Sequence, residues 1–116
     1  MADILCIGTD DTLMQPKQSA LERAGHTVSV AKDVRQVLAA CSGIRFDVIL
    51  IGQTLPGKEK LRVRELLNDH CGSAKIVEQH AAAPELPAAD AHIRAGQSNE
   101  DLIAIIERLV PQRPSA

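Results

Sequence analysis

Two short apolar runs, each ended by a glycine, constrain the fold of this chain more than any other feature. Residues 4–7 are followed by Gly8, and residues 47–51 are followed by Gly52. Apart from the aspartate that opens the second, the runs are continuously apolar, the pattern of strands buried on both faces. Strands of that kind belong to parallel sheets that carry helices on both sides. The runs therefore predict the central strands of an α/β sheet.

Helical and strand patterns alternate through the rest of the chain. Further strands are predicted at residues 26–31, 75–77 and 91–94, and helices at residues 13–24, 34–41, 58–68 and 102–109. The first of these strands alternates polar and apolar residues, which is typical of a sheet edge. Between the last two strands, Pro84 and Pro87 leave no room for a regular helix. The repeated strand–helix order predicts one five-stranded parallel sheet.

Composition excludes several classes of function. The net charge is −2 with a pI near 6.0, so no basic field attracts nucleic acid or an anionic membrane. Phe46 is the single aromatic residue, which excludes a base-stacking platform. No run approaches the roughly 20 apolar residues that span a bilayer, and residues 1–3 lack the basic start of a secretory signal. We therefore expect a cytoplasmic protein that binds neither nucleic acid nor membranes.

The three cysteines are Cys6, Cys41 and Cys71. An odd count at wide spacing predicts no disulfide framework, in keeping with a reducing compartment. Cys6 lies in the middle of a predicted strand and should be an inert core thiol. Cys41, His70 and Cys71 end two neighbouring helices and offer ligands that Zn²⁺ takes, but their spacing matches no zinc motif and a fourth ligand is unclear. We prefer a core cysteine beside a helix-capping pair, and expect no metal or other cofactor.

The helix predicted at residues 58–68 carries a local run of charge. Its basic residues are Lys58, Lys60, Arg62 and Arg64, with Glu59 and Glu65 between them. Alternate residues of a helix point to different sides, so these cations do not form one stripe. We interpret the run as a solvated face and not as a nucleic-acid site.

Three stretches resemble the receiver domain of two-component response regulators. Residues 4–10 resemble its first strand and acidic turn, residues 47–57 its third strand and phosphorylation loop with the Pro-Gly pair, and residues 89–102 its fifth strand and last helix start. The resemblance implies a flavodoxin-like three-layer fold, a five-stranded parallel sheet in the order 2-1-3-4-5, with the fourth helix lost or reduced. We expect a receiver-like domain over residues 1–110 and a flexible tail over residues 111–116.

The residues that do the chemistry of receivers are missing from this sequence. In the family, an aspartate ending the third strand accepts a phosphoryl group beside Mg²⁺, which two acidic residues after the first strand hold. By the resemblance, the phosphoacceptor position falls on Gly52 and the acidic pair on Gly8 and Thr9. The hydroxyl position falls on Gln79 or His80, the lysine position on Ala95, and the proline after it on Gly96.

A shift of register does not restore the reactive site. Sliding the first turn by two residues offers Asp10 and Asp11 as the acidic pair, but shortens the first helix. Asp47 begins the third strand at the opposite end of the sheet, so no carboxylate lies near the phosphoacceptor position. The resemblance therefore implies the receiver fold without its reaction.

These residues predict a non-phosphorylatable signalling domain that acts through protein–protein interaction and is not an enzyme. Its partner is another signalling protein or a second copy; Ile103 and Val110, on a second stripe of the last helix, are the candidate homodimer contact. The alternative is a small-molecule or ion sensor that uses the crevice at the carboxyl ends of the strands. That crevice is lined by Thr9, Asp10, Gln53, Gln79 and His80. A fragment whose output domain is missing is a third possibility.

Overall fold

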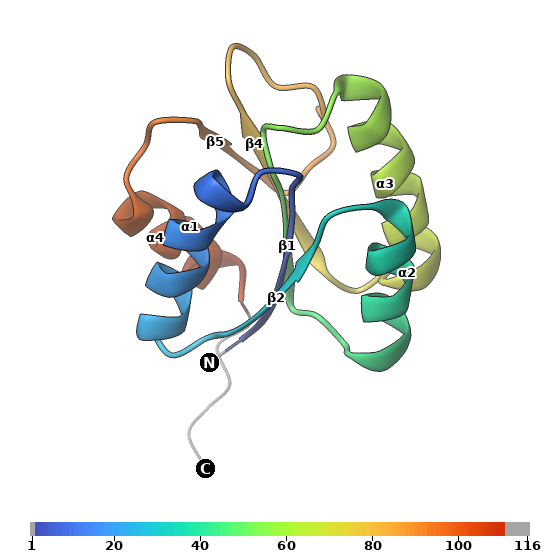
Figure 1. Ribbon diagram of the computed structural model, residues 1–116, viewed down its shortest axis with the longest axis horizontal. Helices are drawn as coiled ribbons and strands as arrows, with labels where there is room; N and C mark the ends of the chain where they lie inside the picture. Colours follow the sequence, from blue (N-terminus) through green and yellow to red (C-terminus); the bar gives the residue numbers. More distant parts are fainter. Residues whose placement is uncertain (1, 111–116) are drawn as a thin grey trace.

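The chain folds into a parallel sheet between two pairs of helices (Figure 1). The computed structural model describes residues 2–110, so the tail predicted at residues 111–116 lies outside the described residues. The elements are β1 (Asp3–Ile7), α1 (Asp11–Arg23), β2 (Thr27–Ala31), α2 (Val34–Gly43), β3 (Val48–Ile51), α3 (Gly57–His70), β4 (Lys75–His80), β5 (Ala91–Arg94) and α4 (Asn99–Leu109). The strand order β2-β1-β3-β4-β5 confirms the predicted topology, with β2 at an edge.

The central strands divide their side chains between two cores, because successive residues of a strand face opposite sides. Figure 1 shows α1 and α4 over one face and α2 and α3 over the other. The first core is built from Ile4, Cys6, Val48 and Leu50 with Met14, Leu21, Leu102 and Ile106. The second is built from Leu5, Ile7, Ile49 and Ile51 with Val37, Val63 and Leu67. Both apolar runs are thus buried on both sides, as their sequence predicts.

Side-chain caps start three of the four helices. The Asp10 carboxylate accepts the Thr12 N–H at 2.9 Å to begin α1, and Asp33 accepts the Gln36 N–H at 2.8 Å to begin α2. Ser98 accepts the Asp101 N–H at 3.1 Å to begin α4. These caps satisfy backbone donors that would otherwise lack a partner at the first turn.

The connection between β4 and β5 is irregular, as the two prolines predict. Residues 81–90 contain no helix, and Leu86 alone among them is fully buried. Its side chain joins the core beneath α2 and α3. β4 is longer than the predicted residues 75–77, since it continues to His80 and is buried from Ile76 onward. The helix expected to be lost or reduced is thus absent between β4 and β5, and the loop with its one buried leucine takes its place.

The expectation that the cysteines form no disulfide is wrong. Cys41 and Cys71 are bonded to each other, with Cα atoms 5.7 Å apart and a sequence separation of 30 residues. The packing of α2 against α3 brings their last turns together, and spacing along the chain does not reveal that contact. The bond also removes both thiols from the metal site considered above. As predicted, Cys71 ends a helix, its N–H donating to Leu67 C=O at 2.7 Å.

Candidate functional site

Gly52 lies where β3 ends, packed against the backbone of β1. Its N–H donates to the Ile7 carbonyl at 2.7 Å. A Cβ atom at residue 52 would lie 2.8 Å from that carbonyl oxygen and 3.7 Å from the Cα of Gly8. The first separation is below van der Waals contact, so a side chain at residue 52 requires the backbone of β1 or β3 to shift.

Met14 of α1 occupies the space beside both glycines. Its side chain is 5% exposed and belongs to the core beneath α1 and α4. The Met14 Cε atom stands where a Cβ of residue 8 would be placed, and 3.7 Å from the position of a Cβ at residue 52. Glycine at residues 8 and 52 therefore makes room for a thioether in the middle of the carboxyl edge.

The polar groups that follow β1 are engaged in local structure. The Thr9 N–H donates to the Thr54 hydroxyl at 3.1 Å. Asp10 caps α1, and Asp11 forms an exposed ion pair with Lys32 at 2.8 Å. Asp10 is therefore engaged in starting α1, and Asp11 in an ion pair at the surface. Within residues 2–110, no group of three or more histidine, cysteine or acidic residues is placed to hold a metal ion.

Gln79 and Lys17 meet across the crevice. Lys17 of α1 donates a hydrogen bond from Nζ to Gln79 Oε1 on β4. Burial lowers the pKa of Lys17, and the neighbouring Cys6 thiol partly opposes that shift. Burial also raises the pKa of Cys6 to about 12, with Lys17 acting in the opposite direction, which fits the predicted inert thiol.

His80 and Ala95 lie at the ends of β4 and β5. The Ala95 N–H donates to the His80 carbonyl at 2.7 Å, and the His80 ring is largely buried. The His80 Nδ1 atom and the Gln53 Oε1 atom are buried without a hydrogen-bond partner among the described residues. The structure thus brings the predicted crevice residues to one edge, although Met14 and Lys17 fill its centre.

A buried ion pair is a second feature, after the disulfide, that the sequence interpretation missed. Lys60 was expected on a solvated face, and this expectation is wrong: its side chain and that of Glu78 are both 0% exposed. Lys60 Nζ lies 2.9 Å from Glu78 Oε2, donates to the Gln79 carbonyl at 3.1 Å, and is 3.3 Å from Glu85 Oε1. An acidic residue within a buried strand requires a cation, which was the available signal.

The Glu78 carboxylate also holds the β4–β5 loop. It accepts the Glu85 N–H at 2.9 Å and the Leu86 N–H at 3.0 Å, and His92 Nε2 lies 3.4 Å from it. Burial acts to raise the pKa of Glu78, but the hydrogen bonds from Lys60 and the two backbone amides outweigh burial and lower it. The ionised carboxylate therefore fixes residues 85 and 86 to β4, in place of a helix.

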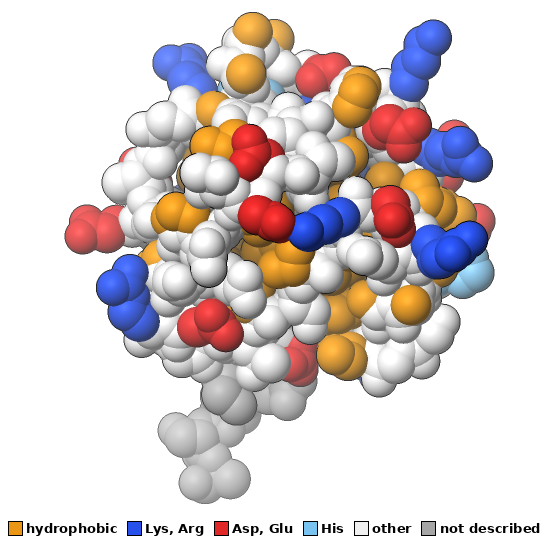
Figure 2. All heavy atoms as spheres, viewed as in Figure 1, with side chains coloured by type: hydrophobic (Ala, Val, Ile, Leu, Met, Phe, Trp, Pro, Cys, Tyr) orange, Lys and Arg blue, Asp and Glu red, His pale blue; other side chains and the backbone are white. Residues whose placement is uncertain are grey.

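The candidate dimer contact is partly internal. Ile103 and Val110 are half-buried and pack against the core beneath α1 and α4. The large apolar side chains with the greatest exposure are instead Leu13, Ile44 and Leu61, at 41%, 41% and 52%. Acidic and basic side chains are interspersed on the face drawn in Figure 2. Homodimerisation through Ile103 and Val110 stays a prediction.

Comparisons with known proteins agree on the fold. No family model matches the chain. A 46-residue segment is 46% identical to the sensor histidine kinase AruS of Pseudomonas aeruginosa, and this match covers 40% of the chain but only 5% of the kinase. No helix within the described residues is long and apolar enough to cross a membrane.

Solved structures of response regulators and receiver domains resemble this chain. The chemotaxis response regulator CheY4 of Vibrio cholerae matches with a TM-score of 0.80 at 22% identity, over 95% of this chain and 99% of that one. A CheY-like receiver protein of Methanospirillum hungatei gives 0.81 at 23% identity, over 94% of each chain. The receiver domain of the sensor histidine kinase PA1611 of P. aeruginosa, which holds magnesium in its active-site cleft, gives 0.77 at 18% identity, over 93% and 96%. The chain therefore has the fold of response-regulator receiver domains.

Proposed function

We propose that this chain is a signalling domain that takes no phosphoryl group and acts by binding another protein. The observation that carries the proposal is the closed phosphoacceptor position. Gly52 has no nucleophile, and the Ile7 carbonyl lies 2.8 Å from where a side chain would begin. The neighbouring backbone thus leaves no room for the carboxylate that phosphoryl transfer in this fold requires.

The surroundings of Gly52 also lack the charges that stabilise the transfer. Phosphoryl transfer depends on a divalent cation and a cationic side chain beside the reacting oxygens. The magnesium-bound PA1611 receiver domain holds its metal in the cleft. Here Gly8 and Thr9 supply no carboxylate, Asp10 caps α1, and Ala95 stands at the lysine position. These residues favour a non-enzymatic role.

Filling of the middle of the crevice by Met14 and Lys17 favours a binding module over a small-molecule sensor. The hollow of about 480 Å³ that remains at this edge lies to one side, between the starts of α2 and α3. Ligand sites in open α/β sheets are hollows at the carboxyl ends of the strands. In this chain Met14 lies between Gly8 and Gly52, and the Lys17–Gln79 hydrogen bond crosses the same edge. A domain without a ligand site or a reaction acts through the surface that it offers to other proteins, and we propose another signalling protein as its partner.

Beryllofluoride with Mg²⁺ tests the proposal, since it mimics the phosphoryl group on receiver aspartates. We expect the amide resonances of Gly8, Gly52 and Ala95 to stay unchanged when both are added to the full chain. The PA1611 receiver domain, treated identically, is the positive control. Saturable shifts at these three amides would contradict the proposal.

A further inference from the structure

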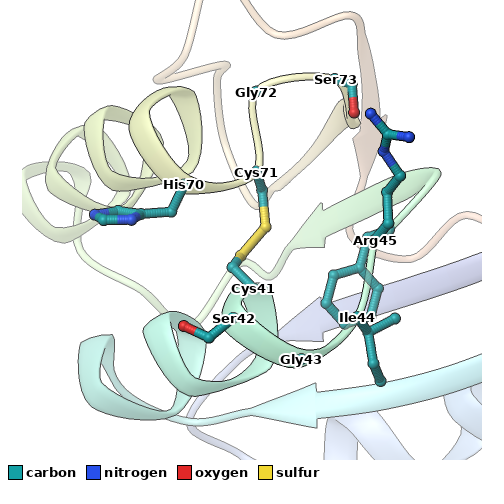
Figure 3. A pocket seen from close by; sticks show the side chains of 10 residues that line it. Cys41, Ser42, Gly43, Ile44, Arg45, His70, Cys71, Gly72 and Ser73 are labelled. Carbon is teal, nitrogen blue, oxygen red and sulfur yellow. A yellow bond between two sulfur atoms is a disulfide. The ribbon is translucent and has the colours of Figure 1, made fainter.

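The Cys41–Cys71 disulfide opens onto a surface hollow. The hollow has a volume of about 470 Å³ and lies between the last turns of α2 and α3 (Figure 3). Both cysteines line it, together with Arg45, Phe46 and Ser73. Figure 3 shows the sulfur–sulfur bond bridging the two helix ends at this site, with the Arg45 side chain across the hollow. Cys41 and Cys71 are half-buried, so this bond is partly accessible from solvent.

The third cysteine provides an internal contrast. Cys6 is 0% exposed in β1, where burial raises its pKa to about 12. Exchange between thiols and disulfides requires a thiolate and access to a sulfur atom. The burial of Cys6 denies it both, whereas the Cys41–Cys71 bond faces a hollow large enough for a small molecule.

We propose that Cys41 and Cys71 form a reversible thiol–disulfide exchange site whose co-reactant is a small-molecule thiol. The thiolate of that molecule attacks one sulfur of the bond, and the other sulfur leaves as a thiolate. The thiolate of a second small molecule then attacks the small-molecule sulfur of the mixed disulfide, and the protein sulfur leaves as a thiolate. Two electrons and two protons pass to the protein, which holds two thiols, while the two small thiols leave joined as their own disulfide. The reverse sequence reforms the bond.

The disulfide contributes most to the packing of α2, because this helix buries few other side chains. Val37 is its one fully buried residue, and Val34, Ala40 and Cys41 are half-buried. α3 is held more firmly, by the buried residues Lys60, Val63 and Leu67. Reduction should therefore loosen α2 against α3 and change the face that the two helices form.

The exchange site lies far from the carboxyl edge of the sheet. α2 and α3 both end where the next strands begin, so the disulfide stands at the edge opposite Gly52. The inference therefore does not depend on whether the carboxyl edge accepts a phosphoryl group.

Glutathione buffers of graded ratio test the exchange directly. The native full chain is equilibrated in each buffer, quenched in acid, alkylated under denaturing conditions and weighed. We expect three alkylated cysteines at the reducing end and one, Cys6, at the oxidising end. Cys6→Ala is the matched control and should give two and none. Two results would overturn the proposal: thiols that persist in glutathione disulfide, or a disulfide that glutathione reduces only after the protein is unfolded.

Hydrogen exchange tests the consequence for α2. We expect the amides of α2 to exchange at least about tenfold faster in the reduced chain than in the oxidised chain, with β1 and β3 unchanged. The double variant Cys41→Ser/Cys71→Ser should behave like the reduced chain in either buffer. Equal protection of α2 in both redox states would show that the bond does not control this helix.

Discussion

Replacing Lys60 with methionine tests the role of the buried ion pair. Methionine has nearly the length of lysine and is flexible, so Lys60→Met removes the charge with little change in volume. The Glu78 carboxylate then keeps the Glu85 and Leu86 amides but loses its cation, in a position that is 0% exposed. An uncompensated charge in such a place is strongly destabilising.

The expected loss of stability depends on which acidic partner of Lys60 is buried. Breaking a buried pair by removing one member costs about 3–5 kcal/mol. The second partner, Glu85, has a side chain that is 46% exposed, so its pair with Lys60 contributes at most about 1 kcal/mol. Since domains of this size unfold with about 5–15 kcal/mol, Lys60→Met should lose a large part of the stability.

Urea unfolding at pH 7 measures the effect. We expect Lys60→Met to lower the free energy of unfolding by about 3–5 kcal/mol. The exposed residue of the same helix, Lys58, is the matched control, and Lys58→Met should change it by less than about 0.5 kcal/mol. Adding Glu78→Gln to Lys60→Met removes the stranded charge and should recover at least about 1 kcal/mol. A loss below about 1 kcal/mol in Lys60→Met, or no recovery in the double variant, would show that the Glu78 carboxylate does not depend on Lys60.

Three further outcomes are expected. The disulfide closes a loop of about 30 residues, so in urea unfolding the oxidised chain should have a free energy of unfolding about 3.6 kcal/mol higher than that of Cys41→Ala. Equal free energies of unfolding would contradict this. Because folding lowers the pKa of Glu78 from 4.5, the ionised carboxylate stabilises the folded chain above about pH 4.5, and this stabilisation is lost as pH falls through the folded pKa. Below about pH 4.5 the native chain should therefore lose stability more steeply than Glu78→Gln. Parallel curves of stability against pH would contradict this. If Ile103 and Val110 form a homodimer contact, the double variant Ile103→Glu/Val110→Glu should sediment as a monomer. A native chain that is monomeric at high concentration, or a double variant that still dimerises, excludes this contact.

Patterns that repeat along the sequence predicted the fold well. Continuous burial of residues 4–7 and 48–51 follows directly from their apolar composition, because each residue meets a core on one side of the sheet or the other. The irregular β4–β5 loop follows from Pro84 and Pro87, whose restriction is local. Such features are encoded by neighbouring residues, so the sequence alone was sufficient to predict them.

Contacts between distant residues were not predictable in the same way. Lys60 and Glu78 meet because α3 packs over β4, and the charge pattern of the helix by itself is typical of a solvated face. The Cys41–Cys71 bond likewise depends on how α2 packs against α3. At the carboxyl edge, the sequence showed that Gly52 lacks a nucleophile, but only the structure shows the Ile7 carbonyl and Met14 closing the position.

The mass of the chain after treatment with acetyl phosphate and Mg²⁺ tests the central claim most directly. Both the native protein and Gly52→Asp should be weighed intact, because the variant supplies the missing carboxylate. We expect no added phosphoryl group on either protein, since Gly8, Thr9 and Ala95 still provide neither metal ligands nor a cation, and the Ile7 carbonyl crowds residue 52. A phosphoryl group on the native chain near Gly52, or efficient labelling of the variant, would show that the carboxyl edge can still accept a phosphoryl group.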